Sequence, residues 1–137
     1  MSSHNAVFGT AVTCMDGRAI AATHSWMKAK HGVTFVDTLT EPGIDGWLSG
    51  TRTNEELAHL QKKLQISIMN HGSHIVTVGG HADCAGHPVS ETEHRAAIEK
   101  TCLIVKQLIA SFTTESVTVI GLYSEEKWVS EPLPLEK

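Results

Sequence analysis

Two short groups of residues in this sequence have the types and spacing of a metal site. The stretch TVGGHADCAG, residues 77–86, holds a histidine and a cysteine three positions apart, and another cysteine stands in TCMDGR near the start of the chain. Two thiolates and one imidazole suit zinc best, because thiolates are soft ligands and no redox change is required. We therefore predict that Cys14, His81 and Cys84 bind Zn2+. Three protein ligands leave a fourth position open, as in catalytic zinc sites.

Asp16 and Arg18 lie two and four positions after Cys14. A carboxylate there could accept a hydrogen bond from a water on the metal, and a guanidinium could hold that carboxylate ionised through a paired fork. Zinc lowers the pKa of its bound water to about 7, so such a site would supply hydroxide near neutral pH. These two residues are our candidate catalytic pair.

Each of these residues also has a purely structural interpretation. H-x-x-C is a weak pattern by itself, and the cysteines and histidine could be two buried thiols and a turn residue. Asp16 and Arg18 could form a loop salt bridge, although an exposed pair contributes only ~0–1 kcal/mol. Asp83 could support the metal site through a hydrogen bond or be an exposed turn carboxylate.

Apolar, β-branched runs alternate with segments of helical spacing along the chain. This alternation predicts an α/β fold, a mostly parallel four-stranded sheet with helices on both faces. Capping boxes at Thr53–Glu56 and Ser90–Glu93 mark two helix starts. The expected strands are 6–15, 33–39, 74–80 and 116–123, and the expected helices begin near residues 18, 53 and 90.

The strand order 2-1-3-4 would reverse between the first and third strands. Ligands of such sheets bind beyond the carboxyl ends of the strands, where the order reverses. The first strand ends in TCMDGR and the third in GGHADC. This order would therefore bring the two halves of the metal site together.

Length and charge narrow the class of protein. The 137 residues are enough for a single domain, 1–137, in which we expect a short tail from about residue 124. The net charge of −4 and the absence of a basic cluster argue against nucleic acid and membrane partners. The N-terminus lacks the basic region of a secretory signal, so we expect a cytoplasmic protein without disulfides.

The two motifs together resemble a known family. Cys14-Met15-Asp16-Gly17-Arg18 and His81-Ala82-Asp83-Cys84, each at the end of an expected strand, are similar to the metal-site motifs of the β-class carbonic anhydrases. The resemblance covers roughly residues 6–123. It implies zinc held by the two cysteines and the histidine, and an Asp16–Arg18 pair that orients zinc-bound hydroxide for attack on carbon dioxide. It also implies a homodimer or higher homo-oligomer, and an Asp16 that could become the fourth zinc ligand.

The segment after the second expected strand departs from the family pattern. Typical members carry Arg-x-Ala-Gly-Asn there and also have a longer N-terminal arm and further elements after the fourth strand. Here the segment is TLTEPGIDGWLSG. We expect Ile44 and Trp47, with Gly80 and Gly86, to line a small-molecule substrate pocket, although a surface turn with a docked tryptophan explains the segment equally well.

These departures leave two other functions open. A zinc enzyme with this pocket could hydrolyse another small electrophile, such as carbonyl sulfide or carbon disulfide. A zinc-binding protein without catalysis would also retain the motifs. Among the remaining candidates, Cys102 is expected in the core, and His87 and His94 are expected in surface or cap positions, with proton transfer as the alternative role.

Overall fold

The computed structural model describes residues 6–134, which form one five-stranded sheet in the order β2-β1-β3-β4-β5. The first four strands are parallel, and β5 pairs antiparallel with β4. This confirms the predicted α/β class and the order of the first four strands. The strands are β1 (Phe8–Thr13), β2 (Phe35–Thr40), β3 (Ile75–His81), β4 (Thr118–Ser124) and β5 (Ser130–Pro132).

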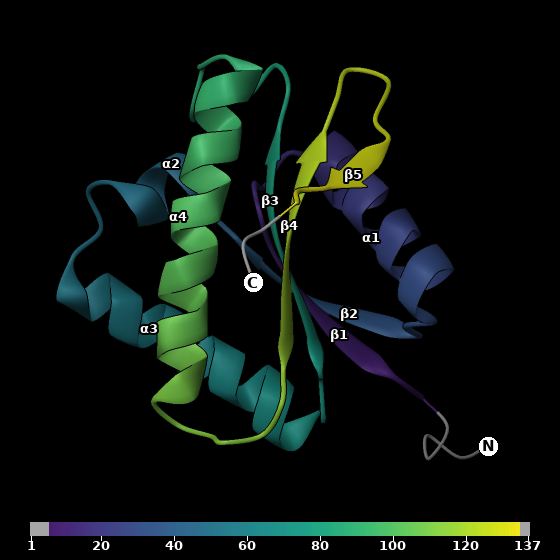
Figure 1. Cartoon of the computed structure of the whole chain (residues 1–137), viewed down its shortest axis with the longest axis vertical. Coiled ribbons are helices and arrows are strands. Elements are labelled where there is room, and N and C mark those ends of the chain that lie inside the picture. The colour runs from purple at the N-terminus through teal and green to yellow at the C-terminus, as the bar shows by residue number, and fades with distance from the viewer. Residues whose placement is uncertain (1–5, 135–137) are drawn as a thin grey trace.

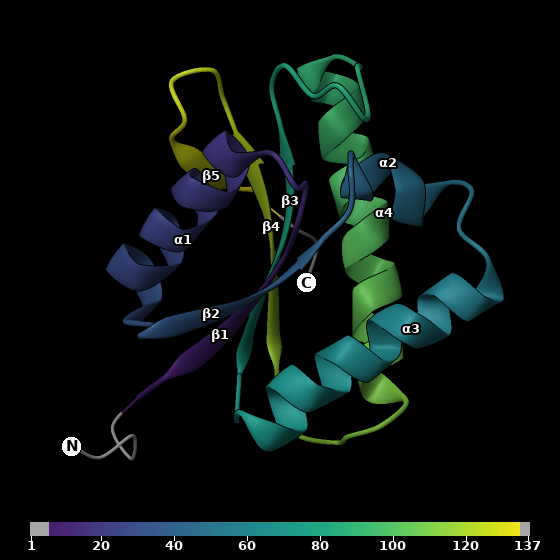
Figure 2. The same cartoon turned by 180° about the vertical axis from the view of Figure 1, so that it is seen from behind.

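Helices cover both faces of the sheet, as Figure 1 shows. One face is covered by α1 alone, and the other by α2, α3 and α4. A π-helical turn, η2, continues α3 (Figure 2). The bounds are α1 (Gly17–His31), α2 (Ile44–Ser49), α3 (Asn54–Gln65), η2 (Ile66–Asn70) and α4 (Glu91–Ala110). Within residues 6–134, no helix is both long and apolar enough to cross a bilayer.

β3 is the middle strand of the sheet, and a hydrophobic cluster packs against each of its two faces. All seven residues of β3 are buried, as expected for a strand with helices on both faces. The larger apolar cluster fills the space under α2, α3 and α4 and includes Leu64, Ile98 and Val105. A smaller one, with Met27 at its centre, lies under α1. Burying these side chains contributes roughly 1.5–3 kcal/mol each.

Two elements were not predicted from the sequence. The segment 41–50 was expected to be irregular but contains α2, which begins after Gly43 in a left-handed conformation, φ 53°. Part of the segment expected to be a tail from about residue 124 forms β5 instead, paired with β4 from Leu122 to Ser124. Both elements are short, and local periodicity cannot resolve helices or strands of so few residues.

Both predicted capping boxes are present. The hydroxyls of Thr53 and Ser90 accept hydrogen bonds from the backbone N–H groups of Glu56 and Glu93, and each glutamate carboxylate accepts from the cap N–H in return. These caps satisfy N–H groups that have no partner within the helix. The second cap fixes where α4 begins, and therefore the position of His94 in its first turn.

Candidate metal centre

Cys14, His81 and Cys84 meet beyond the carboxyl ends of β1 and β3. Cys14 directly follows β1, His81 is the last residue of β3, and Cys84 stands three positions later. All three are buried, with 5%, 1% and 4% of their surfaces exposed. One ligand atom from each lies within 4.8 Å of the other two. The strand order therefore brings these three residues together, as the sequence predicted.

The separation of the two sulfur atoms fits two thiolates on a tetrahedral zinc ion. The two Sγ atoms are 3.9 Å apart, close to the ~3.8 Å that separates two thiolates at a Zn–S distance of ≈ 2.3 Å. This separation is far too long for a disulfide. The Nδ1 atom of His81 donates to the carbonyl of Ala82 at 2.6 Å, which leaves Nε2 buried with no hydrogen-bond partner. A buried imidazole nitrogen fixed in this way is a typical metal ligand.

Backbone N–H groups point at both sulfur atoms. The amide of Gly43 donates to the Sγ of Cys14 at 3.3 Å, and the amides of Gly86 and His87 donate to Cys84. Burial, with the adjacent Cys14 adding to it, raises the pKa of the Cys84 thiol to about 11. Without a cation the Cys84 thiol would stay protonated, whereas a bound cation would stabilise the thiolate forms that the amides already face.

Asp16 and Arg18 form the predicted fork beside this cluster. The Nε and Nη2 atoms of Arg18 donate to the two carboxylate oxygens of Asp16 at 3.1 and 2.8 Å. Asp16 also caps α1 by accepting the backbone N–H of Arg18 at 2.8 Å. The hydrogen bonds from Arg18 outweigh desolvation and lower the pKa of the Asp16 carboxyl to about 2. Asp16 is therefore ionised throughout the neutral pH range.

Arg18 also joins the two loops that carry the cysteines. Its Nη1 atom lies 3.3 Å from the carboxylate of Asp83, whose side chain is largely exposed. The hydrogen bonds that Arg18 donates to both aspartates raise the pKa of the guanidinium further above its ordinary value. Asp83 thus pairs with Arg18 across the loops, and its backbone is left-handed, φ 54°.

Trp128 is a neighbour of this site that the sequence did not indicate. It lies between β4 and β5, and its ring is 4.4 Å from the Cζ atom of Arg18 and 5.7 Å from the ring of His81. Its φ of 60° is unusual for an aromatic residue. A strained conformation of this kind persists only where surrounding contacts hold it. No motif places Trp128 here, because its position depends on the unpredicted strand β5.

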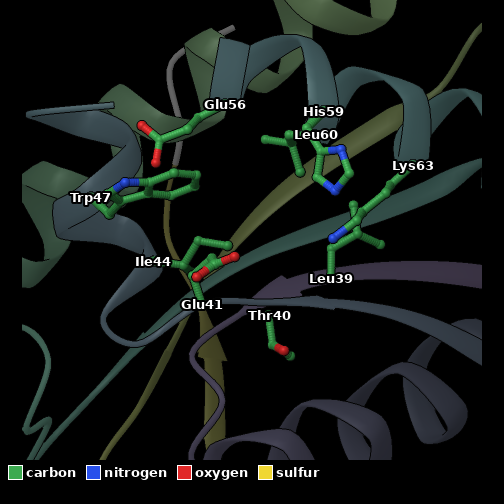
Figure 3. Close-up of a pocket in the computed structure, with 9 residues that line it drawn as sticks. All are labelled: Leu39, Thr40, Glu41, Ile44, Trp47, Glu56, His59, Leu60 and Lys63. Atoms are coloured by element: carbon green, nitrogen blue, oxygen red, sulfur yellow. The ribbon is translucent and has the colours of Figure 1, made fainter. Parts of the chain in front are cut away.

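Ile44 and Trp47 lie in a pocket that does not include the cysteines. Figure 3 shows these two residues in a pocket that side chains of α3 also line, together with Glu41, which directly follows β2. The pocket encloses about 270 Å³, counting its part open to solvent. None of the three candidate zinc ligands lines it. The assignment of Ile44 and Trp47 to the substrate pocket therefore remains a prediction.

Gly80 and Gly86 are positions of close approach. A Cβ atom at Gly86 would lie 2.7 Å from backbone atoms of Pro42 and Gly43, and one at Gly80 would lie 2.8 Å from the Oδ2 atom of Asp45. Glycine at residue 86 lets the loops after β2 and β3 touch through their backbones. A substrate-lining role for either glycine also stays a prediction.

His87 and His94 differ from what the sequence led us to expect. His94 is buried, with 1% of its surface exposed, and its Nδ1 atom lies 2.6 Å from the carboxylate of Asp45. His87 is mostly buried and faces the same carboxylate. A surface role for His94 is therefore wrong. Asp45 was missed because it lies in the segment that we expected to be irregular. The third cysteine, Cys102, lies in the core as predicted, and burial raises the pKa of its thiol to about 12.

Comparisons with known proteins agree with the fold and the motifs. Residues 4–133 match a protein family described as "Putative carbonic anhydrase". The solved structure of β-carbonic anhydrase isoform I from Trichomonas vaginalis is similar, with a TM-score of 0.60 and 15% identity over 96% of this chain and 86% of the other. The β-carbonic anhydrase of Aspergillus fumigatus has a TM-score of 0.55 and 12% identity over 96% and 77%. No protein with a curated description matches the sequence.

Proposed function

The chain belongs to the putative carbonic anhydrase family, and from that premise we propose that it catalyses the zinc-dependent, reversible hydration of carbon dioxide to bicarbonate. The observation that carries this proposal is the Asp16–Arg18 fork beside a buried cluster of two thiols and one imidazole. A salt bridge with a purely structural role does not need to lie next to three metal-ligand side chains, whereas a catalytic pair does.

Cys14, His81 and Cys84 would hold the zinc ion through two sulfur atoms and the Nε2 atom of His81. Zinc bound there supplies hydroxide near neutral pH, because it lowers the pKa of a water molecule to about 7. The N–H groups that face the sulfur atoms would balance the negative charge of two thiolates. The His81 bond to Ala82 keeps the ring turned so that Nε2 faces the cluster.

Asp16 would act by accepting a hydrogen bond from the nucleophilic water. Its carboxylate stays ionised, since its pKa is about 2, so it is an acceptor across the working pH range. Arg18 donates a hydrogen bond to each carboxylate oxygen of Asp16, and this paired contact fixes the plane of the carboxylate. The remaining lone pairs would be free to accept from the nucleophile, and the oxygen that attacks carbon dioxide would then be held in one orientation.

The test is carbon dioxide hydration by zinc-loaded protein, measured in a stopped-flow instrument for the wild type, Asp16→Asn and Asp83→Asn. Asparagine can still cap α1, so Asp16→Asn removes the charge and leaves the helix start in place. We expect turnover to fall by about 100-fold or more, with zinc still bound. Asp83→Asn is the matched control, because Asp83 contacts the same guanidinium, and its turnover should stay within a few-fold of the wild type.

Two results would contradict the proposal. One is undiminished turnover in Asp16→Asn. The other is no hydration of carbon dioxide by wild-type protein that holds zinc at the two cysteines. In that case carbonyl sulfide and carbon disulfide are the next substrates to assay, because the altered segment after β2 gives the site different surroundings.

A further inference from the structure

A second cluster of ligand-type side chains lies on the opposite face of β3. Asp45 comes from α2, His94 from the first turn of α4, and His87 from the loop between β3 and α4. Asp45 and His94 are each 1% exposed, and one ligand atom from each of the three residues lies within 4.8 Å of the others. No cysteine takes part. This cluster has a different set of ligands from the candidate zinc site, although His87 and Cys84 lie in the same loop after β3.

Each oxygen of the Asp45 carboxylate faces one imidazole. The Oδ2 atom is 2.6 Å from the Nδ1 atom of His94, and the Oδ1 atom is 3.3 Å from the Nδ1 atom of His87. The two rings stand edge to face, with centroids 4.8 Å apart. The carboxylate is therefore held between two nitrogen atoms, and no lysine or arginine contributes to the cluster.

Two of the imidazole nitrogens are buried without a partner. These are the Nδ1 atom of His87, which faces Asp45 but does not have hydrogen-bond geometry, and the Nε2 atom of His94. A buried polar atom without a partner costs about 1–3 kcal/mol. The Nδ1 atom of His87 therefore faces a buried carboxylate without a hydrogen-bond partner, as is expected where a ligand belongs to the site.

The backbone is packed closely around these side chains. A Cβ atom at Gly80 would lie 2.8 Å from the Oδ2 atom of Asp45 and 3.2 Å from the Nδ1 atom of His94. At Gly46 it would lie 2.6 Å from the ring of His87. Larger residues at either glycine would displace the cluster. The close backbone therefore holds the three side chains together in one cluster.

We propose that Asp45, His87 and His94 form a second metal site, which binds a divalent transition-metal ion such as zinc. Two imidazoles and one carboxylate are a common ligand set for zinc and for non-haem iron. Ligand atoms 2.0–2.2 Å from a tetrahedral ion lie about 3.3–3.6 Å from one another, and the 3.3 Å separation of His87 and Asp45 is at the short end of that range.

The distance between His94 and Asp45 shows what the ion would replace. At 2.6 Å it is a hydrogen bond, so a hydrogen atom now lies where the ion would bind. These two atoms need to separate by about 0.7 Å or more to coordinate the ion. In return, a divalent cation would neutralise a buried carboxylate that has only imidazoles beside it. His87 lies at the partly exposed edge of the cluster, which gives the ion a way in.

The experiment is a zinc titration of metal-free protein, with bound metal counted by native mass spectrometry. The wild type should bind two equivalents per chain, whereas His87→Ala and His94→Gln should each bind one. The double variant Cys14→Ser/Cys84→Ser should also bind one, because it retains the second site. The proposal does not rest on the proposed function, since the count needs no turnover.

The matched control is His71→Ala. His71 is also paired with a carboxylate, that of Asp37 at 2.7 Å, but no second histidine joins them, so this variant should still bind two equivalents. Cobalt titrations check that the buried variant His94→Gln is folded, because cobalt at Cys14 and Cys84 gives an intense thiolate charge-transfer absorption. Wild-type protein that saturates at one equivalent would overturn the proposal. So would a second equivalent that survives in both His87→Ala and His94→Gln.

Discussion

The two clusters on either side of β3 differ in their ligands and in how the chain builds them. The first joins two thiols and one imidazole at the ends of β1 and β3, and the second joins one carboxylate and two imidazoles under α2 and α4. His81 and Gly80 are adjacent in β3, and successive residues of a strand point to opposite faces. The end of β3 thus contributes the His81 imidazole to the first cluster, and the backbone at Gly80 packs closely against the second.

The clusters also share two backbone segments. The amide of Gly43, two residues before Asp45, donates to Cys14, and the amide of His87 donates to Cys84. Side chains of these segments build the second cluster while their N–H groups face the sulfur atoms of the first. The comparison teaches that the segment after β2 supports the first cluster through its backbone, even though its sequence departs from the family pattern.

The largest effect should come from removing a thiol. In Cys84→Ser the hydroxyl is protonated at neutral pH and is a poor zinc ligand, so the zinc affinity of the first cluster should fall by at least about 100-fold. The second cluster should be unaffected. Competition with a chromophoric chelator measures both affinities. Cys102→Ala is the control, because Cys102 packs in the core and its loss should leave zinc binding intact. Equal affinity in Cys84→Ser and the wild type would show that the ion binds elsewhere.

Gly80→Ala and Gly79→Ala separate the two faces of β3. A Cβ atom at Gly80 meets Asp45 and Ile98 at 2.8 and 3.0 Å, whereas at Gly79 the nearest atom is the Oγ1 of Thr13 at 3.5 Å, an ordinary contact. We expect Gly80→Ala to lower the free energy of unfolding by about 1–3 kcal/mol. Gly79→Ala should change it by less than about 1 kcal/mol. Urea denaturation measures both, and equal losses would mean that the second cluster is not tightly packed.

A smaller effect is expected at Trp128, which contacts only the first cluster. Its ring covers the guanidinium of Arg18, a contact that contributes about 0.5–2 kcal/mol. In Trp128→Ala, Arg18 would hold Asp16 less firmly, so carbon dioxide turnover should fall by about 3- to 10-fold with zinc binding unchanged. Trp128→Phe should keep most of the turnover, because it retains an aromatic face. A loss of zinc in Trp128→Ala would contradict this role.

The smallest effect is a pH dependence of stability at Asp16. The pKa of its carboxyl is about 2 in the folded protein and 3.8 ordinarily, so its ionised form stabilises the fold fully above about pH 4. That contribution should disappear as the pH falls from about 4 to 2. The fork is partly exposed, so we expect less than about 1 kcal/mol. The difference in unfolding free energy between metal-free wild type and Asp16→Asn should shrink across this window. A difference independent of pH would exclude the charge as its cause.

The first cluster could be predicted because each of its halves is a local motif. Cys14 and Asp16 follow one strand, His81 and Cys84 end another, and the parallel topology brings strand ends together. The helices with capping boxes were predicted for the same reason, since their signals lie within four residues. Predicting these features requires only patterns within a few residues and the rule that ligands bind beyond the carboxyl ends of parallel strands.

The second cluster could not be predicted, because its contacts are long-range and its segments look irregular. Asp45 and His94 are 49 positions apart, and Asp45 lies in α2, a helix with Gly46 inside it. Glycine weakens a helical pattern by about 1 kcal/mol, yet here it makes room for the ring of His87. Only the packed fold shows why a poor helix former is needed there. β5 and Trp128 could not be predicted either, because a three-residue strand that ends in Pro132 is too short to show an alternating hydrophobic pattern.

The most direct test of the account is zinc K-edge X-ray absorption on wild-type protein that carries one equivalent of zinc. We expect the ion in the first cluster, with two sulfur ligands at about 2.3 Å and two nitrogen or oxygen ligands at about 2.0–2.1 Å. A spectrum with only nitrogen and oxygen ligands would contradict the account. It would place the first ion away from Cys14 and Cys84 and remove the basis for the proposed hydration of carbon dioxide.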